Sequence, residues 1–369
     1  MILRNKNMKA VNSTKNMTEF FNKKTVVSFF LSVLVVLIHI HSFDSYDFNG
    51  ALGSGLSYFG KFVNNGVTGV AIRLFFVISG VLFYRNYTYK STVSKYRSRF
   101  KTLVVPYLFW CMLYTVAMMV LYLTPAKSLM VIENPFIFKN ILLGVFWNYY
   151  YKSFWFILDL IVFTLLCPVF YTLLKNKYVG AIVIITTVVL YAFDIKIPET
   201  ISISGIEYAV FWRADSIVFY MIGAYIGLHC FDWFTKGKSK WIAVLGLIAF
   251  FGCAIVRTIC TMRGIAIEGA FHILFITVFC WATWTMFDLL SFEKKPKHFC
   301  EYSFMMFALN YYLGVYISKI LYLVLPKAQI FCLVNLLLTL IFEISFILLF
   351  SHLLKKNFPK IYSIITGGR

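Results

Sequence analysis

The stretch Thr25–Ser42 reads TVVSFFLSVLVVLIHIHS and contains no Lys, Arg, Asp or Glu. A helix needs about 20 largely apolar residues to cross the hydrocarbon core of a bilayer, so this stretch predicts a transmembrane helix. Nine further runs of similar length follow it along the 369-residue chain. The composition agrees, because 60% of the residues are hydrophobic and only 14% are charged. The sequence therefore predicts an all-α, polytopic membrane helix bundle of about ten transmembrane helices.

The ten expected spans fill most of the chain. They are Thr25–Ser42, Val67–Tyr84, Leu103–Leu123, Phe154–Leu174, Val179–Phe193, Tyr208–Leu228, Trp241–Arg257, Ala270–Leu290, Tyr302–Leu325 and Ile330–Leu354. The pair Ser79-Gly80 in the second span predicts close packing against another helix. We expect one transmembrane domain over residues 25–354, preceded by a mobile cytoplasmic segment (1–24) and followed by a cytoplasmic tail (355–369).

Lys and Arg gather in alternate connections. The N-terminal tail, the even-numbered connections and the C-terminal tail hold about 24 of the 35 basic residues. Because basic residues are enriched on the cytoplasmic side of membrane proteins, both termini are expected to face the cytoplasm. The net charge of +20 then reflects membrane insertion and contact with anionic lipid. Nucleic acid is not an expected partner.

The eight Cys residues occur singly along the chain. Structural zinc sites need Cys or His ligands at short, paired spacings, and disulfide frameworks need recurring Cys pairs. The sequence therefore predicts neither a metal site nor a disulfide framework.

Two imidazoles, His39 and His41, end the first expected span. A neutral imidazole near the aqueous boundary can accept a proton from a hydroxyl, which suits a general base. The alternative is that both rings lie at the outer interface and contact only headgroups or water. The residues alone leave both interpretations open.

Several charged residues lie inside expected spans, where an unpaired charge is costly. Arg73 opens the second span, Asp159 lies one turn into the fourth, and Arg213 and Asp215 lie in the sixth. Each is expected to find a partner in the bundle. Arg73, Arg213 and Asp215 are candidates for structural charge or for stabilising an oxyanion. Trp155 belongs to an aromatic run that can stack on sugar rings or lie in the interfacial belt.

A basic run, KYRSRFK over residues 95–101, leads into the third span at Pro106-Tyr107. Arg97, Arg99 and Lys101 alternate along it and concentrate positive charge at the inner membrane surface. Such a cluster suits a phosphate-bearing ligand. Ordinary anchoring by the positive-inside rule explains the same residues without a ligand, so both explanations remain open.

These stretches, in this order, resemble the membrane-bound acyltransferase 3 family, which includes bacterial O-antigen and peptidoglycan O-acetyltransferases. The resemblance runs from about Thr25 to about Ser351. It is carried by VVLIH at the end of the first span, by RLFFVISG from Arg73, and by the basic run before Pro106. WFI from Trp155 and FWR from Phe211 also look like family elements.

The resemblance implies a ten-helix bundle in the bacterial inner membrane that transfers an acyl group, usually acetyl. The donor would be a cytoplasmic acyl-CoA, as co-substrate and without a bound cofactor. The acceptor would be a hydroxyl of a polysaccharide or lipid-linked glycan, and membrane lipid is the other partner. The family's essential His corresponds to His39 as general base, and its phosphate-binding pair to Arg97 and Arg99, with Lys101 adjacent.

Two positions depart from the family pattern. The family tends to have Arg eleven positions before the His, where this chain has Ser28. Lys24 lies one turn earlier on the same helix face and is the candidate replacement in the donor site. Near the ninth span the family often has His, where this chain has Asn310. We therefore expect His39 to be the principal base, with Asn310 and His41 on the acceptor side together with Trp155 and Asp159.

A transporter or flippase for lipid-linked sugars is the alternative. About ten helices with cytoplasmic termini, and charges such as Arg73, Asp159 and Arg213 inside them, also suit a transport path. Such a protein is expected to show inverted internal repeats, and none is visible in the sequence. A polysaccharide polymerase would need larger outer loops with acidic or Arg clusters. The enzyme is the favoured interpretation.

Overall fold

The computed structural model describes residues 2–125, 134–193, 200–203, 206–209 and 214–368. The chain divides into two compact units. Unit 1 comprises Met1–Asn86, Leu173–Ile195 and Val218–Leu348. Unit 2 comprises Tyr87–Thr172, Lys196–Ile217 and Leu349–Arg369. Helices dominate both units, as the sequence predicted.

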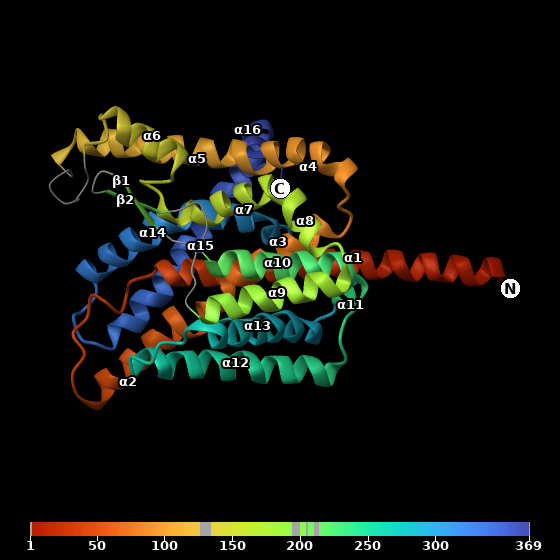
Figure 1. Ribbon diagram of the computed structural model, residues 1–369. Coiled ribbons are helices and arrows are strands. Elements are labelled where there is room, and N and C mark those ends of the chain that lie inside the picture. The colour runs from red at the N-terminus through yellow and green to blue at the C-terminus, as the bar shows by residue number, and fades with distance from the viewer. Residues whose placement is uncertain (1, 126–133, 194–199, 204–205, 210–213, 369) are drawn as a thin grey trace. The chain divides into compact units, whose positions relative to one another are not determined.

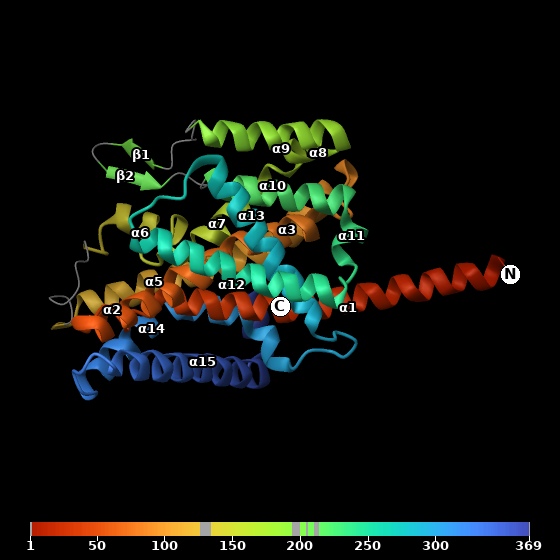
Figure 2. The same ribbon diagram turned by 90° about the horizontal axis from the view of Figure 1, so that it is seen from below.

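Unit 1 is a bundle of long helices (Figure 1). Its elements are α1 (Ile2–His39), α2 (Gly50–Lys61), η1 (Phe62–Gly66), η2 (Val67–Val70), α3 (Ala71–Tyr84), α9 (Lys177–Ala192), most of α10 (Ala214–His229), α11 (Phe231–Thr235), α12 (Lys240–Met262), α13 (Gly269–Met286), η7 (Phe287–Leu289), η8 (His298–Tyr302), α14 (Ser303–Val324) and most of α15 (Phe331–Asn357). In Figures 1 and 2, α12 and α13 lie side by side, and the first turns of α1 extend beyond the other helices of this unit.

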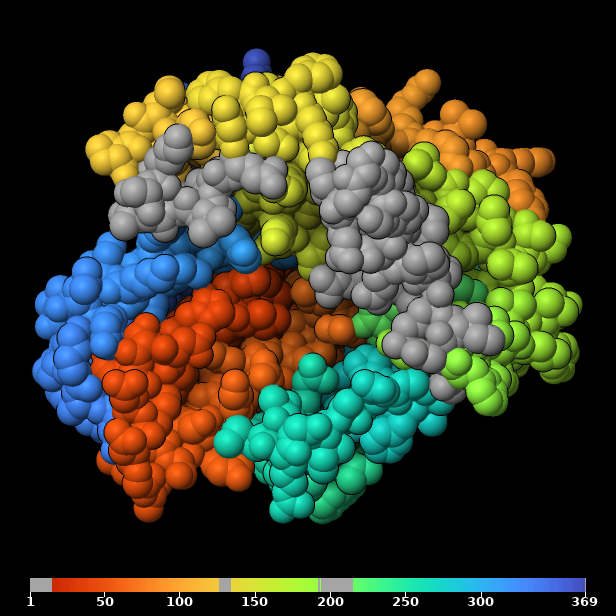
Figure 3. Space-filling view, turned by 60° about the vertical axis from the view of Figure 1, so that its left-hand side comes forward, coloured from red at the N-terminus to blue at the C-terminus, as the bar shows by residue number. Residues whose placement is uncertain are grey.

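The two ends of unit 1 differ in charge. One end, called the basic end here, carries Lys23 and the connection with Lys236, Lys238 and Lys240. At the opposite end lie the connections over residues 40–49, 263–268 and 325–330. Figure 3 looks toward this opposite end, where the orange-red segment around α2 and the teal α12–α13 connection reach the surface.

α1 and α14 pack along each other and run in the same direction. The Ser32 hydroxyl donates to the Ser303 carbonyl at 3.2 Å. Two turns further along both helices, the ring of His39 meets the ring of Tyr311, with centroids 5.0 Å apart. The two helices therefore advance together, since seven residues of α1 and eight of α14 separate these two contacts.

The chain stays beside α14 after α1 ends. The rings of Tyr46 and Tyr322 meet at 5.0 Å. The backbone N–H of Asn49 donates to the Gln329 side chain at 3.1 Å, and the Gln329 amide donates back to the Asn49 carbonyl at 3.3 Å. The connection after α1 is therefore held against α14 and the start of the next connection, residues 325–330.

The next crossing differs from the expected span. The sequence predicted Val67–Tyr84, but α2, η1, η2 and α3 form a continuous helical stretch from Gly50 to Tyr84. η1 is a π-helix and contains Asn64 and Asn65. This polar pair interrupts the apolar run, so the helical part before it was missed.

Helix α3 crosses α10 at two glycines. An ideal Cβ on Gly80 would lie 2.7 Å from the Ala224 backbone nitrogen, and one on Gly223 would lie 2.8 Å from the Val77 carbonyl carbon. Only glycine permits this approach of two helix backbones. The expected packing role of Gly80 is therefore confirmed.

A polar seam joins α14 and α15 inside unit 1. The Asn335 amide donates to the Ser318 carbonyl at 3.0 Å. The hydroxyls of Thr339 and Ser318 lie 3.0 and 3.2 Å from the Asn335 side-chain oxygen. All three residues are buried, and interhelical hydrogen bonds of this kind fix the packing of membrane helices.

Unit 2 is also mainly helical. Its elements are η3 (Tyr89–Ser91), α4 (Thr92–Arg99), η4 (Phe100–Val104), α5 (Val105–Tyr122), α6 (Phe138–Phe146), η6 (Lys152–Phe154), α7 (Trp155–Leu165), most of α8 (Cys167–Leu174), α16 (Pro359–Thr366) and the antiparallel pair β1 (Thr200–Ile203) and β2 (Ile206–Ala209). The Trp110 indole donates to the Ile365 carbonyl at 3.0 Å and so ties α16 to α5. Tyr114 stacks on Tyr151 with centroids 3.9 Å apart.

Two expected spans in this part of the chain end or begin differently. Phe154–Leu174 is broken into α7 and α8, which meet at 66°. Pro168 explains the break, because proline lacks the backbone donor and disfavours helix at the preceding residue. The expected span Tyr208–Leu228 begins too early, since Tyr208 lies in β2 and α10 begins at Ala214.

The described residues give a lower bound on the number of membrane crossings. Seven helices there are long and apolar enough to span a membrane, and an eighth is obtained when the bent pair α7–α8 is counted as one span. The protein is thus a multi-pass, all-α membrane bundle with one small β-hairpin. The count of ten crossings stays a prediction.

Candidate functional site

His39 lies deep in unit 1. It ends α1 and its ring meets Tyr311 edge to face at an interplanar angle of 75°. Tyr311 is the midpoint of the apolar span His298–Val324. Along α1, sixteen residues separate His39 from Lys23 at the basic end, which corresponds to about 24 Å of helix. His39 therefore lies at the level of Tyr311 in the bundle, and its position relative to the membrane boundary stays a prediction.

The π-helix η1 packs against the end of α1 beside His39. The Asn64 amide donates to the Ile40 carbonyl at 3.3 Å, and the Thr68 hydroxyl donates to the Asn64 carbonyl at 2.6 Å. These bonds hold the backbone where α1 stops being helical. The side-chain oxygen of Asn64 is buried and accepts no hydrogen bond from the described residues. The Asn64 side-chain oxygen is therefore an available hydrogen-bond acceptor beside Ile40, the residue that follows His39.

The neighbouring residue of η1 connects to a cation. The Arg257 Nε donates to the Asn65 carbonyl at 2.9 Å. An ideal Cβ on Gly69 would lie 2.7 Å from Arg257 Cδ and 2.9 Å from its Cζ, so the guanidinium rests on that glycine. Arg73 follows Gly69 by four residues, one helical turn further, and its charge repels that of Arg257. Two arginines therefore share one region near His39.

Asn310 on α14 and Glu343 on α15 add two buried polar side chains to unit 1. Asn310 precedes Tyr311 and is fully buried; neither its nitrogen nor its oxygen has a hydrogen-bond partner among the described residues. Glu343 of α15 is also fully buried, and a Cβ on Gly314 would lie 3.3 Å from its carboxyl carbon. Its two oxygens have no partner among the described residues either. Asn310, predicted for the acceptor side, thus lies at the height of His39.

The other residues predicted on α1 and after it are placed differently. His41 is exposed, and its Nδ1 lies 2.8 Å from Asp44 Oδ2. Ser28 is buried. The buried cation of this end is Lys23, which binds Asp288 at 2.8 Å and lies 4.4 Å from the Trp284 ring centroid. The role expected for Lys24, which is half-buried, stays a prediction.

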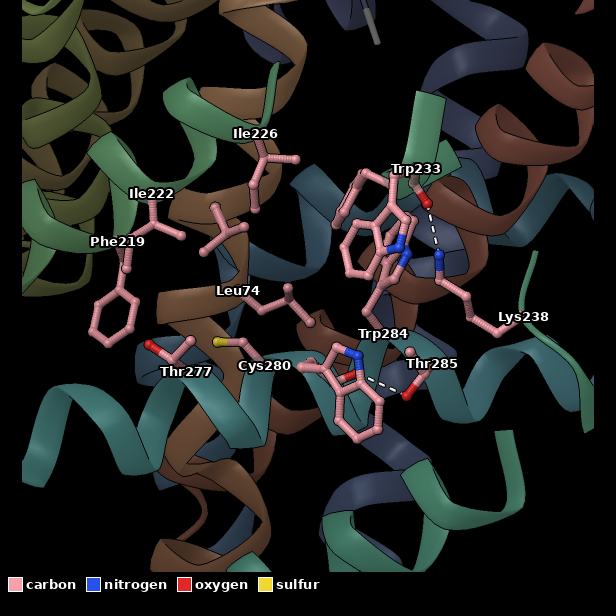
Figure 4. A pocket seen from close by; sticks show the side chains of 13 residues that line it. Leu74, Phe219, Ile222, Ile226, Trp233, Lys238, Thr277, Cys280, Trp284 and Thr285 are labelled. Carbon is pink, nitrogen blue, oxygen red and sulfur yellow. Dashed lines mark hydrogen bonds between the residues drawn. The ribbon is translucent and has the colours of Figure 1, made fainter. Parts of the chain in front are cut away.

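An apolar cavity of about 200 Å³ lies near Lys23 at the basic end. It is lined mainly by apolar and aromatic side chains of α3, α10, α11 and α13, with Leu74, Trp233 and Trp284 among them (Figure 4). Lys238 stands at its edge and donates to the Trp233 carbonyl at 2.7 Å. Burial lowers the pKa of Lys238, and the nearby carboxylate of Asp288 opposes that shift.

In unit 2, the basic run forms α4 and the π-helix η4. The Tyr96 hydroxyl donates to the Leu165 carbonyl at 2.8 Å and so fixes α4 on α7. Arg97 borders two hollows. One, of about 310 Å³, includes Arg99, and the other, of about 530 Å³, includes Lys101. The helix thus separates Arg99 from Lys101, and Arg97 is the cation that both hollows share.

The remaining candidates lie outside unit 1 or outside the described residues. Trp155 begins α7, and Asp159 is buried one turn later in the same helix. Asp215 is buried in the first turn of α10. Arg213 lies outside the described residues. Trp155 and Asp159 therefore belong to unit 2, whereas His41 and Asn310, the other acceptor-side candidates, belong to unit 1.

Three residues near His39 were missed from the sequence. Arg257 was taken as the end of an expected span, and Asn64 and Asn65 were taken as part of a loop. Each carried a signal: Arg257 is a charge close to an apolar run, and two adjacent amides directly precede the RLFFVISG element. Among the described residues, no group of three His, Cys, Asp or Glu side chains could hold a metal ion.

Comparisons with known proteins identify the family of the chain. A family model described as an acyltransferase domain matches residues 29–355, which is nearly the whole chain. No curated protein and no solved structure matches the chain. Because the family model covers far more than half of the sequence, the chain belongs to the acyltransferase 3 family and is a membrane-bound acyltransferase.

Proposed function

We propose that this acyltransferase moves an acyl group, in the simplest case acetyl, from a cytoplasmic acyl-CoA to a hydroxyl of a cell-surface or lipid-linked carbohydrate. His39 is the general base. The protein lies in the bacterial inner membrane, and its termini and the basic end of unit 1 face the cytoplasm. The observation that carries the proposal is the position of His39 inside unit 1, where its ring meets Tyr311 and Asn64 binds the next residue, Ile40.

The reaction needs one base and no redox partner. The neutral imidazole of His39 accepts the proton of the acceptor hydroxyl as that oxygen attacks the thioester carbonyl. The tetrahedral intermediate carries a negative charge on the former carbonyl oxygen. Amide N–H groups or the Arg73 cation are suited to stabilise that charge. When the carbon–sulfur bond breaks, the thiolate of CoA takes the proton from the imidazolium.

The donor's nucleotide end is assigned to the α4–η4 region of unit 2. Phosphates prefer arginine, whose planar group can form two parallel hydrogen bonds, and Arg97 borders both hollows there. Lys101 and Arg99 add one cation on each side. Lys24 is the candidate for a further donor contact on α1. Membership of the acyltransferase family favours this enzyme over a transporter for lipid-linked sugars.

The base is tested with purified full-length protein in liposomes, radioactive acetyl-CoA and a bacterial glycan extract as acceptor. His39→Ala is expected to insert normally and to lose transfer by about 100-fold or more, since general base catalysis contributes about 10²–10⁴-fold. The matched control is His41→Ala, an exposed imidazole two residues away, which should retain activity. Full activity of His39→Ala, or loss of activity only in His41→Ala, would refute the assignment.

The donor site is tested by charge removal at Arg97. Arg97→Gln is expected to raise the Michaelis constant for acetyl-CoA about 10-fold, because a charged hydrogen bond contributes about 1.5–3 kcal/mol. Lys356→Gln, which removes an exposed cation from the same unit, is the control. An unchanged Michaelis constant in Arg97→Gln would mean that the basic run only orients the protein in the membrane.

A further inference from the structure

The apolar cavity at the basic end of unit 1 has no part in the proposed transfer reaction. One face of α10, with Ile222 and Ile226, and one face of α13 form its walls, and Leu74 of α3 adds to them (Figure 4). From Thr277 to Thr285 the cavity follows α13 for eight residues, which is about 12 Å of helix. The cavity is therefore a built space between three helices of one unit.

The surface of this cavity is almost entirely apolar. The hydroxyls that line it already donate within α13, from Thr277 to the Ile273 carbonyl at 2.7 Å and from Thr285 to the Trp281 carbonyl at 2.9 Å. A ligand that buries amide or hydroxyl groups here would leave them unpaired, which costs free energy. The pantetheine arm of a CoA donor contains amides and does not suit such a surface. An unbroken hydrocarbon chain does.

The volume limits how much of a chain the cavity can hold. An apolar cavity of about 150 Å³ admits benzene, so the volume of about 200 Å³ admits on the order of eight carbon atoms. The cavity can therefore take the first part of one acyl chain of a membrane lipid.

The edge of the cavity has the residues of a headgroup site. The Lys238 ammonium lies 3.9 Å from the ring centroid of Trp233 and donates to the carbonyl of that residue at 2.7 Å. Trp233 is exposed, and both residue types are common where membrane helices meet the lipid headgroups. These contacts hold the ammonium beside the cavity, and it keeps further N–H donors for a ligand.

The charge at this edge favours an anion. Lys238 repels both Lys236 and Lys23. Of the carboxylates on the neighbouring elements, Asp288 pairs with Lys23 at 2.8 Å, and Asp232 on α11 is exposed. Basic pockets between transmembrane helices on the cytoplasmic side are typical sites for anionic lipid headgroups. A phosphate at Lys238 would relieve the repulsion between the lysines.

We propose that this cavity binds an anionic phospholipid of the cytoplasmic leaflet. The headgroup phosphate binds Lys238, the first part of one acyl chain fills the cavity, and the remainder of the lipid lies in the bilayer. The bound chain joins α3, α10 and α13 and so stabilises unit 1. The choice of leaflet rests on the orientation given under the proposed function, whereas the site itself requires no role for His39.

Binding is tested on the purified full chain in an uncharged detergent. The probes are phosphatidylglycerol and phosphatidylcholine, each with bromine atoms on the acyl chains close to the headgroup. Bromine quenches tryptophan fluorescence at short range, and Trp233, Trp281 and Trp284 line the cavity. At equal mole fraction, phosphatidylglycerol should quench more strongly than phosphatidylcholine and should raise the unfolding temperature more.

Two variants test the headgroup and the chain separately. Lys238→Gln should weaken binding of phosphatidylglycerol about fivefold, whereas Lys240→Gln, which removes an exposed cation from the same connection, should not. Ile222→Phe keeps every charge and fills part of the cavity, so it should abolish the preference for phosphatidylglycerol. Ile248→Phe, at an exposed position of α12, is its control.

Four results would overturn the inference. They are equal quenching and equal stabilisation by the two lipids, a preference for phosphatidylglycerol that survives both Lys238→Gln and Ile222→Phe, binding of oleate through Lys238 without binding of phosphatidylglycerol, and displacement of the lipid by acetyl-CoA. The last result would assign the cavity to the donor. None of these measurements involves acyl transfer, so the lipid site and the role of His39 can fail independently.

Discussion

A glycine-to-alanine substitution is expected to destabilise the protein at the α3–α10 crossing of unit 1 and to stabilise it in the interior of α12. At Gly80, a new Cβ would lie 2.7 Å from the Ala224 nitrogen, whereas ordinary contact begins at 3.4 Å. The Tyr220 carbonyl oxygen is closer still, and both obstacles are helix backbone, so the two helices must separate by about 1 Å. Overpacking of this kind costs about 1–3 kcal/mol. Gly80→Ala should therefore destabilise the protein by about 2 kcal/mol.

Gly252 provides the control on α12. It lies in the helix interior, and nothing lies within 4 Å of an added Cβ. Alanine favours helix over glycine by about 0.8–1 kcal/mol, so Gly252→Ala should stabilise by up to that amount. The two variants are thus expected to differ by roughly 3 kcal/mol. The measurement is equilibrium unfolding of the purified chain by SDS in mixed micelles, followed by tryptophan fluorescence.

Combining Gly80→Ala with Gly223→Ala tests the geometry itself. Both glycines lie at one crossing, where a Cβ on Gly223 would also meet backbone, that of Val77. One separation of the helices relieves both overlaps, so the double variant should lose less stability than the sum of the single variants. A Gly80→Ala protein as stable as the wild type, or strictly additive losses, would refute the close approach of α3 and α10.

Two further predictions concern buried polar contacts in unit 1. Lys23→Met leaves Asp288 charged and buried, and should destabilise the protein by about 3–5 kcal/mol. Adding Asp288→Asn should recover most of that loss in the same unfolding assay. No recovery would mean that the pair has another role. Asn335→Leu removes the amide that joins Ser318 and Thr339, and should lower the free energy of unfolding by about 0.6–2 kcal/mol in that assay. An unchanged stability would show that the packing of α14 on α15 does not depend on this polar seam.

The sequence predicted the class of fold because the physics behind it is local. Each apolar run such as Trp241–Arg257 must form a helix to satisfy its own backbone in lipid, and this needs no knowledge of neighbouring helices. The breaks were harder. Pro168 was visible in the sequence, but the length of Phe154–Leu174 suggested one span. The π-helix at Asn64 depends on contacts with Ile40 and Arg257, which are far apart in sequence, and so could not be predicted.

The height of His39 illustrates the same limit and has a chemical consequence. Hydropathy shows where an apolar helix ends, and it places His39 at a boundary. Its place in the bundle is set by the contact with Tyr311 and by the bond from Asn64 to Ile40, and hydropathy shows neither. The contacts with α14 and η1 leave the His39 imidazole half-buried inside unit 1. In such a site electrostatic contacts are strong and a thioester is protected from hydrolysis, whereas a base at the interface would offer water the same activation as a sugar hydroxyl. The early end of α1 at His39 therefore favours transfer to a bound acceptor over hydrolysis of the donor.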